Sequence, residues 1–305
     1  MSSPHPDDPV GYCVEIAIEA SSLANMDLFS LSDPFAILSA PGIPSRANEG
    51  RGKSNQMILG RTETQWDVLN PCFVKSFVLQ PETPNGMQLN VAIYDRDSKS
   101  SSLDKQDLIG LAICSVQDVI SSGTEGVTLR LDPPSGKDKS VGNVTLIADL
   151  YDDAAPSHEL KFLVERSSFK NMSALGQFLT KPYLVIYRRR PNNKWAPIFR
   201  SKATRREEDP AYSHDVVTSA TIRTYNGRGR CEETPLRIEL RAHKANTEHR
   251  LIGATQMSLA SLRRQTAGKR LSLGLGGEAV GEIIFRSVVL DTTVSSFEFE
   301  INFAS

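Results

Sequence analysis

Short runs of alternating apolar and polar residues dominate the chain from residue 12 onward. The first run, Tyr12–Ala20, places Val14, Ile16 and Ile18 on one face, which is the period-two pattern of a half-buried β-strand. Turn-forming residues separate the runs, and only Ser115–Ser121 has the spacing of a short helix. The further runs in this half are Pro34–Ala40, Met57–Thr64, Phe73–Leu79, Met87–Asp95, Leu108–Cys114, Gly126–Leu131 and Val144–Tyr151. Together these runs predict an antiparallel β-sandwich.

The same pattern then starts again. Asp107-Leu108-Ile109-Gly110 matches Arg250-Leu251-Ile252-Gly253, and Asn70-Pro71-Cys72-Phe73 matches Asp209-Pro210-Ala211-Tyr212. A period of about 145 residues indicates a duplicated domain, because solenoid repeats are far shorter. The strand candidates of this half are Glu159–Glu165, Pro182–Tyr187, Pro197–Ala203, Val216–Ile222, Pro235–Ala242, Leu251–Met257, Arg270–Leu275, Gly281–Leu290 and Phe297–Phe303. We therefore expect an all-β fold of two tandem, eight-stranded, antiparallel Greek-key β-sandwiches.

Composition places the boundaries between these parts. Residues 1–9 are rich in proline and aspartate and are expected to be a disordered N-terminus. The first sandwich is expected over residues 10–152 and the second over residues 158–303. Residues 153–157 contain Ala154, Ala155 and Pro156, which is typical of a short linker.

The two halves carry opposite charge. Residues 1–153 contain 11 Lys+Arg against 21 Asp+Glu, a net charge of −10, and the remainder contains 24 against 15, a net charge of +9. The whole-chain charge of −1 therefore says nothing about partners, and each half has to be interpreted separately.

Acidic residues gather in two loops of the first half. Asp27 and Asp33 bracket the loop between the first two strands, and four more acids join the strand ending at Tyr94 to the next one: Asp95, Asp97, Asp104 and Asp107. Strand parity brings both loops to the same end of a sandwich. Crowded carboxylates repel one another unless a cation lies among them, and calcium takes about six to eight oxygen ligands from flexible loops. The alternative is a set of solvated turn acids, although few Lys or Arg residues lie nearby to neutralise them.

These motifs resemble those of the C2 domain, a calcium- and phospholipid-binding β-sandwich. The resemblance is carried by Ser32-Asp33-Pro34-Phe35, Tyr94-Asp95-Arg96-Asp97 and Asp107-Leu108-Ile109-Gly110, and by Arg61-Thr62-Glu63 leading to Leu69–Phe77. The long gap between Asp97 and Asp107 and the tandem arrangement of the two halves are most similar to those of copines. The resemblance implies calcium as the cofactor and assigns its five ligand positions to Asp27, Asp33, Asp95, Asp97 and Asp107. Asp104 lies in the lengthened part of the loop and is a candidate additional ligand.

The same resemblance implies a mechanism of membrane binding. Bound calcium would reverse the charge of the acidic end and share coordination positions with anionic phospholipid head groups. Apolar residues between the ligands would enter the membrane interface: Leu28, Phe29, Leu31 and, more weakly, Leu103. The alternative for the first three is that one or two of them face the core.

The second half keeps the strand pattern and loses the acids. Leu175, Lys181, Ala242, Lys244 and Arg250 fall at the five ligand positions. None is acidic and three are basic, so we expect the second sandwich to bind no calcium.

Basic residues instead lie on or between the second to fourth strands of this half. They predict contact with an anionic surface, at roughly 1 kcal/mol for each cation near an acidic leaflet. Three alternatives stay open: a solvated face offset by nearby acids, docking onto the acidic first sandwich, and nucleic acid, which the lack of interleaved aromatic residues disfavours. The candidate anion-binding residues are Lys181, Arg188, Arg189, Arg190, Arg200, Lys202, Arg205, Arg206, Lys244 and Arg250.

The sequence contains no catalytic motif in a suitable context, and we therefore expect the protein not to be an enzyme. Four scattered cysteines and the absence of a signal peptide or membrane-length apolar run favour a soluble cytoplasmic protein. Asp291-Thr292-Thr293-Val294-Ser295 is similar to the metal motif of the A-type domain of copines, but only ten residues follow it, so we expect a short copine-like chain or a fragment.

The sequence thus predicts a monomeric, calcium-dependent phospholipid-binding protein that a calcium rise recruits to anionic membranes, above all the plasma membrane. The second sandwich would add electrostatic or protein contacts. The alternative is a constitutive scaffold or adaptor in which calcium is secondary.

Overall fold

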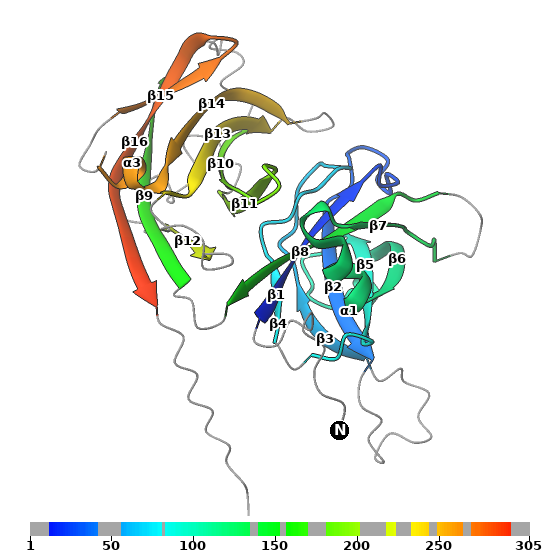
Figure 1. The fold of residues 1–305 in the computed structure, drawn as a ribbon. Coiled ribbons are helices and arrows are strands. Elements are labelled where there is room, and N and C mark those ends of the chain that lie inside the picture. The colour runs from blue at the N-terminus through cyan, green and yellow to red at the C-terminus, as the bar shows by residue number, and fades with distance from the viewer. Residues whose placement is uncertain are drawn as a thin grey trace, which may run out of the picture.

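The computed structural model describes residues 12–41, 56–80, 83–134, 140–152, 157–169, 181–201, 218–223, 233–243, 249–264 and 270–293. They form two β-sheet units that lie side by side, with the chain passing from β8 to β9 between them (Figure 1). We call the described residues up to Asp152 the first unit and those from Ser157 the second unit. The predicted disordered N-terminus, most of the predicted linker and the Phe297–Phe303 strand lie outside the described residues.

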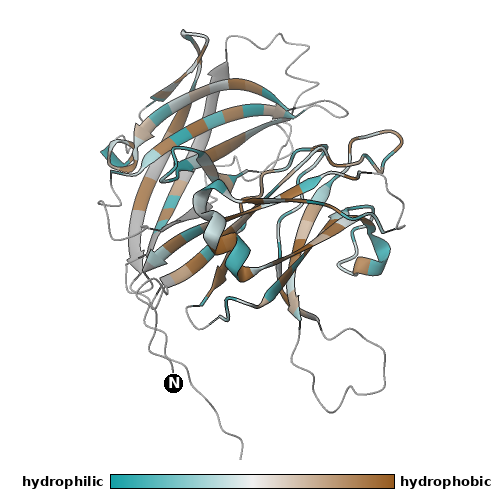
Figure 2. Cartoon of the chain, turned by 45° about the vertical axis from the view of Figure 1, so that its right-hand side comes forward, coloured by the Kyte–Doolittle hydropathy of each residue, from teal (hydrophilic) through white to brown (hydrophobic). Residues whose placement is uncertain are grey.

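The first unit contains two four-stranded antiparallel sheets, in the orders β4-β1-β8-β7 and β3-β2-β5-β6. Its core is contiguous and includes Ile16, Leu38 and Val91, none of which exposes any surface. Bands of apolar and polar residues alternate along these strands (Figure 2), as the sequence pattern predicts. The strands are β1 (Tyr12–Ser21), β2 (Pro34–Pro41), β3 (Gln56–Arg61), β4 (Phe77–Leu79), β5 (Gln88–Asp95), β6 (Asp107–Ser115), β7 (Val127–Arg130) and β8 (Asn143–Asp152).

One helical segment was expected in this unit, and α1 occupies Val116–Ser122. Ser115 caps it: the Ser115 hydroxyl accepts a hydrogen bond from the backbone N–H of Asp118, and the Asp118 carboxylate accepts one from the backbone N–H of Ser115. This reciprocal capping satisfies two of the otherwise unpaired donors at the helix start.

The predicted strand Phe73–Leu79 is shorter in the structure, where only Phe77–Leu79 joins a sheet. The reason is a side chain. The Glu63 carboxylate accepts hydrogen bonds from the backbone N–H groups of Val74 and Lys75 at 2.7 and 3.2 Å. These donors are therefore not available to a strand ladder, and the segment before Phe77 folds as a loop against Glu63.

The second unit repeats the arrangement strand for strand. Its sheet order, β11-β10-β13-β14-β15-β16-β9-β12, joins the counterpart of β3-β2-β5-β6 to the counterpart of β7-β8-β1-β4. Within the described part of the chain, only Ala254 and Gly274 pair across that junction. The strands are β9 (Ser157–Phe169), β10 (Lys181–Arg189), β11 (Trp195–Arg200), β12 (Thr218–Arg223), β13 (Pro235–His243), β14 (Arg250–Ser258), β15 (Arg270–Leu275) and β16 (Glu278–Thr293), with α3 at Leu259–Arg264. The predicted tandem β-sandwich fold is confirmed.

The glycine of the repeated Ile-Gly motif is explained by the same kind of close packing in both units. A Cβ atom on Gly110 would lie 2.9 Å from Leu131 Cβ, and one on Gly253 would lie 3.1 Å from Leu273 Cβ. Since a Cβ atom at either position would crowd a neighbouring leucine, glycine lets β6 pack closely against Leu131 and β14 against Leu273 of β15.

Among the described residues, no helix has the length and apolar character needed to cross a bilayer.

Candidate metal centre

Three strand ends meet at one edge of the first unit. Asp95 ends β5 and lies opposite both Pro34, which starts β2, and Asp107, which starts β6. The loop before β2 carries Asp27 and Asp33, and the loop after β5 carries Asp97 and Asp104. This register brings acids more than sixty residues apart to one place, as strand parity predicts.

Asp27, Asp95 and Asp97 form the centre of this cluster. Each offers a carboxylate oxygen within 4.8 Å of the others. Asp95 is 1 % exposed, Asp27 is half-buried and Asp97 is exposed. The cluster therefore runs from the end of the core outward to solvent, which leaves one side open to an incoming ligand.

The buried Asp95 carboxylate fits a cation. Its Oδ1 accepts a 2.6 Å hydrogen bond from the backbone N–H of Asp33, whereas its buried Oδ2 has no hydrogen-bond partner. Burial raises the pKa of Asp95 against the lowering effects of the Ser32 side chain and the Asp33 backbone N–H, and the nearby charges of Asp27 and Asp97 raise it further. An orphaned carboxylate oxygen beside two further carboxylates is a donor set suited to calcium, which binds oxygen ligands alone.

Asp33 belongs to the same electrostatic cluster. Burial raises the pKa of its carboxyl group to about 6, with contributions from the charges of Asp67, Asp95 and Asp27, against the lowering effect of a hydrogen bond. That bond comes from the backbone N–H of Asp67, which donates to Asp33 Oδ1 at 2.7 Å. Because burial and, to a smaller extent, the neighbouring carboxylates disfavour the charged form of Asp33, a cation at this site would stabilise that form.

The raised pKa of Asp33 sets a pH dependence. Because that pKa, about 6, exceeds the 3.8 of an ordinary aspartate, the metal-free folded protein holds more protons than the unfolded chain between these values. We therefore expect the free energy of unfolding to be highest below about pH 4 for this group and to fall as the pH rises through 6. Urea unfolding in chelator at pH 4.5 and 7 measures this fall. Asp33→Asn should reduce it, and equal falls in both proteins would contradict the assignment.

The remaining two predicted ligands lie at the rim. The backbone N–H of Asp107 donates to Asp97 Oδ2 at 2.9 Å, so the start of β6 holds the Asp97 side chain in place. Asp104 lies in a 3₁₀ turn, Leu103–Lys105, where its carboxylate accepts a hydrogen bond from the Ser102 hydroxyl. Asp104 is exposed and outside the cluster.

Two residues that support the cluster were not expected from the sequence. Gln106, 7 % exposed, accepts hydrogen bonds from the backbone N–H groups of Asp97 and Ser98 and donates one to Ser100 O. Asp67 accepts one from the backbone N–H of Leu31. Neither is a ligand candidate, and both fix the loops that carry ligands. Polar residues in loops are too common for this role to have been visible in the sequence.

The loop before β2 projects two large apolar side chains into solvent. Leu28 and Phe29 are 92 % and 90 % exposed. Asn25 braces this loop by donating to the backbone oxygens of Asp27 and Ser30. Leu31 and Leu103 are only partly exposed. Of the three apolar candidates in this loop, Leu28 and Phe29 therefore do not face the core, and Leu31 is partly buried.

The second unit lacks such a cluster within its described residues. Ala242, at one ligand position, is 4 % exposed in β13, and Arg250, at another, is exposed at the start of β14. The positions of Leu175 and Lys244, and the side chain of Lys181, lie outside the described residues.

Two candidate anion-binding residues, Arg188 on β10 and Arg190 just after it, lie in the contact between the two units. Arg188 Nη2 lies 2.9 Å from Asp149 Oδ2 and 3.4 Å from Glu15 Oε2. Arg190 Nε lies 3.3 Å from the same Asp149 oxygen. All four residues expose less than a tenth of their surface. These ion pairs bind the acidic outer face of β1 and β8 to the basic second unit.

The other candidate anion-binding residues have different environments. Arg189 and Arg250 are exposed, and Arg200 is partly buried beside the contact between the units. Lys202, Arg205 and Arg206 lie outside the described residues. A further contact joins the second unit to the loop that supports Asp33, since His243 Nε2 lies 2.9 Å from Asp67 Oδ2.

Comparison with known proteins identifies the family. The C2 domain family model matches residues 12–131 and 159–272, which is most of the chain. The chain therefore belongs to the C2 domain family, and it contains two copies in tandem.

Two curated relatives are plant proteins. The chain is 22 % identical over 273 residues to Protein BONZAI 2 of Arabidopsis thaliana and 22 % identical over 274 residues to Protein BONZAI 1 of the same organism. Each match covers 86 % of this chain but 44 % of the relative, so the chain spans less than half the length of these proteins.

Solved structures of C2 domains are also similar. One titled BON1-C2B matches 48 % of this chain and 95 % of its own, with 24 % identity and a TM-score of 0.35. The calcium-bound pair of C2 domains of Extended-Synaptotagmin 2 matches 94 % of this chain and 98 % of its own, with 14 % identity and a TM-score of 0.33. TM-scores this low carry no argument about how the units are arranged.

Proposed function

We propose that the chain is a calcium-dependent phospholipid-binding protein whose first unit docks on anionic membranes. The observation that carries the proposal is the convergence of Asp27, Asp95 and Asp97 around a buried carboxylate oxygen that has no hydrogen-bond partner. In this proposal Asp33 and Asp107 complete the calcium ligands, and residues 10–152, 153–157 and 158–303 are the first C2 domain, the linker and the second C2 domain.

The physical mechanism is a reversal of charge. Without calcium, the carboxylates at this edge repel an anionic lipid surface. Bound calcium would neutralise them and supply coordination positions for phosphate or carboxylate oxygens of the head groups. Leu28 and Phe29 lie beside the cluster with their side chains in solvent, where they can enter the interface once repulsion is removed.

The wider role follows from the same site. We propose a monomeric, non-enzymatic protein of the cytoplasm that calcium recruits to the plasma membrane, of the copine type with respect to its tandem units. Similarity to the BONZAI proteins supports this type, at low identity and over less than half of their length. The second unit supports the membrane-binding unit by docking on it, which the buried pairs of Arg188 and Arg190 favour.

Co-sedimentation with vesicles tests the proposal. With phosphatidylserine vesicles we expect the protein in the pellet with calcium and in the supernatant with chelator, and with phosphatidylcholine alone it should stay in the supernatant. Equal pelleting with calcium and with chelator would instead favour the constitutive scaffold, for which the exposed Arg189 and Arg250 provide cationic contacts.

The apolar loop gives a separate prediction. Leu28→Ser combined with Phe29→Ser should weaken binding to phosphatidylserine vesicles by roughly 10- to 100-fold, since burying one such side chain contributes about 1.5–3 kcal/mol and insertion is partial. Calcium affinity in solution should not change. Ile113→Ser is the matched control, because Ile113 is 53 % exposed on β6 away from the loop tips. If the double variant bound vesicles like the wild type, Leu28 and Phe29 would not contact the membrane.

A further inference from the structure

A short segment of the first unit, Gln65–Val68, lies against the part of the chain that carries Asp33. The backbone N–H of Gln65 donates to Pro34 O at 2.9 Å. The Gln65 side chain is buried and donates to Cys72 O, which anchors the segment to the body of the first unit. The segment therefore fixes the chain at a predicted calcium ligand, although it supplies no ligand itself.

Asp67 is the residue of this segment that reaches Asp33. Its backbone φ is 51°, in the left-handed region that Asp and Asn adopt more readily than most residues. In this conformation its N–H donates to Asp33 Oδ1 at 2.7 Å, and its own Oδ1 accepts a hydrogen bond from the backbone N–H of Leu31 at 3.2 Å. Asp67 thus holds both a candidate ligand and the backbone two residues before it.

The second unit holds the other oxygen of the same carboxylate. His243 Nε2 lies 2.9 Å from Asp67 Oδ2, and the two side chains are 9 % and 12 % exposed. Because a carboxylate oxygen only accepts hydrogen bonds, Nε2 is the donor. The Asp67 side chain is therefore fixed from two directions, by Leu31 of the first unit and by His243 of the second.

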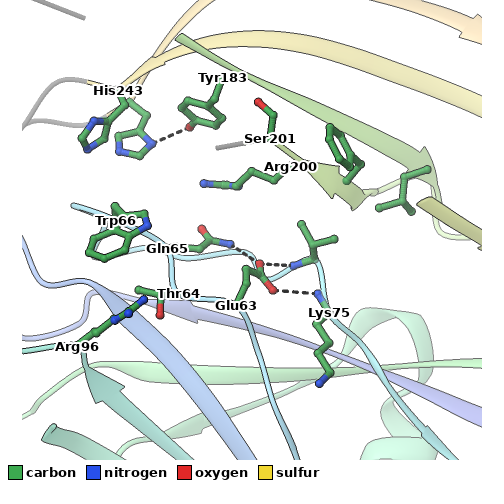
Figure 3. A pocket seen from close by; sticks show the side chains of 14 residues that line it. Glu63, Thr64, Gln65, Trp66, Lys75, Arg96, Tyr183, Arg200, Ser201 and His243 are labelled. Carbon is green, nitrogen blue, oxygen red and sulfur yellow. Dashed lines mark hydrogen bonds between the residues drawn. The ribbon is translucent and has the colours of Figure 1, made fainter. Parts of the chain in front are cut away.

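His243 is itself held firmly within the second unit. It ends β13, its ring meets the ring of His249 edge-on with centres 4.7 Å apart, and His249 Nδ1 lies 2.6 Å from the Tyr183 hydroxyl. Figure 3 shows His243 and Tyr183 on one wall of a pocket of about 700 Å³ between the units, and Trp66, the neighbour of Asp67, on the other. The second unit thus presents an ordered donor to the first.

The place of His243 in the second unit is informative. It lies between Ala242 and Lys244, two of the positions at which this unit lacks the acids of the first. The edge of the second unit that has no calcium ligands of its own therefore contacts the segment that supports a ligand of the first unit.

We propose that His243 is a positioning residue for the calcium site of the first unit and that it acts through Asp67 on Asp33. The inference rests on the calcium site of the proposed function. While the units are docked, Asp67 is held at both carboxylate oxygens and keeps the Asp33 carboxylate in one orientation before calcium arrives. Since a ligand oriented in advance loses less freedom on binding, the docked form binds calcium more tightly. By reciprocity, calcium stabilises the docked arrangement to the same extent.

Calorimetric titration of the full chain with calcium tests this inference. His243→Phe keeps a ring against His249 and removes the donor, so it should raise the Kd for calcium roughly three- to tenfold, as expected for the loss of one hydrogen bond. His243→Gln keeps a side-chain N–H and should retain most of the wild-type affinity. Lys194→Gln is the matched control and should bind as the wild type does, because the exposed 2.7 Å ion pair of Lys194 also joins the units but ends at Glu125 rather than at Asp67.

Asp67→Gly tests the route by which His243 acts. Glycine adopts a φ of 51° without strain, so this variant removes the carboxylate and leaves the backbone conformation accessible. It should weaken calcium binding at least as much as His243→Phe, and adding His243→Phe to it should cause no further loss. This variant also replaces His243→Phe if that protein does not fold. Wild-type affinity in Asp67→Gly, or effects of the two substitutions that add, would overturn the proposed route.

Hydrogen exchange in chelator gives a readout that needs no metal. Because the Leu31 N–H donates to the carboxylate that His243 holds, His243→Phe should speed exchange in the peptide that contains Leu31, whereas Lys194→Gln should not. Unchanged exchange would show that His243 does not fix this loop and would overturn the inference. If the wild type bound no calcium, the proposed function would be wrong as well. If it bound calcium and His243→Phe bound it equally tightly, only this inference would be wrong.

Discussion

Asp95→Asn should raise the calcium concentration needed for binding to phosphatidylserine vesicles on the order of a hundredfold, because calcium affinity follows the number of charged ligands. Asparagine has the same shape and keeps an oxygen that can accept the backbone N–H of Asp33. The substitution also removes a buried charge that lies among other carboxylates. We therefore expect the metal-free variant to melt at a higher temperature than the wild type, while the calcium response is lost.

The matched control is Asp104→Asn in the same loop. Asp104 is exposed, hydrogen-bonded to Ser102 and outside the cluster. This variant should sediment with vesicles as the wild type does. A loss equal to that of Asp95→Asn would mean that the loop changes on calcium binding and that Asp104 is a ligand.

Arg188→Ala should separate the two units. It removes the cation that the Glu15 and Asp149 carboxylates share, and leaves Asp149 with Arg190; the Glu15 and Asp149 side chains are 9 % and 1 % exposed. Removing one partner of a buried ion pair costs about 3–5 kcal/mol, and separation of the units limits that cost because it returns both carboxylates to water. Small-angle X-ray scattering should show a larger radius of gyration for the variant than for the wild type.

Arg189→Ala is the control for this prediction, since the neighbouring side chain is exposed. It should leave the scattering curve unchanged. Adding Glu15→Gln to an Arg188→Met variant should restore a compact particle in part, because Asp149 keeps its ion pair with Arg190. If Arg188→Ala scattered like the wild type, the ion pairs would not hold the units together.

The fold was predictable because its signals are local. Alternation of apolar residues marked the strands, and the spacing of residues over Ser115–Ser121 marked the short helix that forms as α1. The candidate ligands were predictable for a related reason. Since β2, β5 and β6 are neighbours, the acids at Asp95 and Asp107 had to lie opposite each other once the strands were assigned.

From the sequence, docking of the second unit on the acidic first unit was only one of several open alternatives. Glu15 and Asp149 are direct partners across β1 and β8, and like charges at such positions destabilise a sheet unless a cation lies between them. That signal appears only after the register is known. Asp67, Gln106 and Gln65 carried no signal, because a polar loop residue shows its role only through partners that are distant in sequence.

The central claim is that the carboxylate cluster of the first unit binds calcium. A calorimetric titration of the full chain with calcium measures this most directly, with the wild type beside a variant that combines Asp95→Asn and Asp97→Asn. We predict saturable binding by the wild type and none by the variant. Absence of binding by the wild type, or equal binding by both proteins, would contradict the claim.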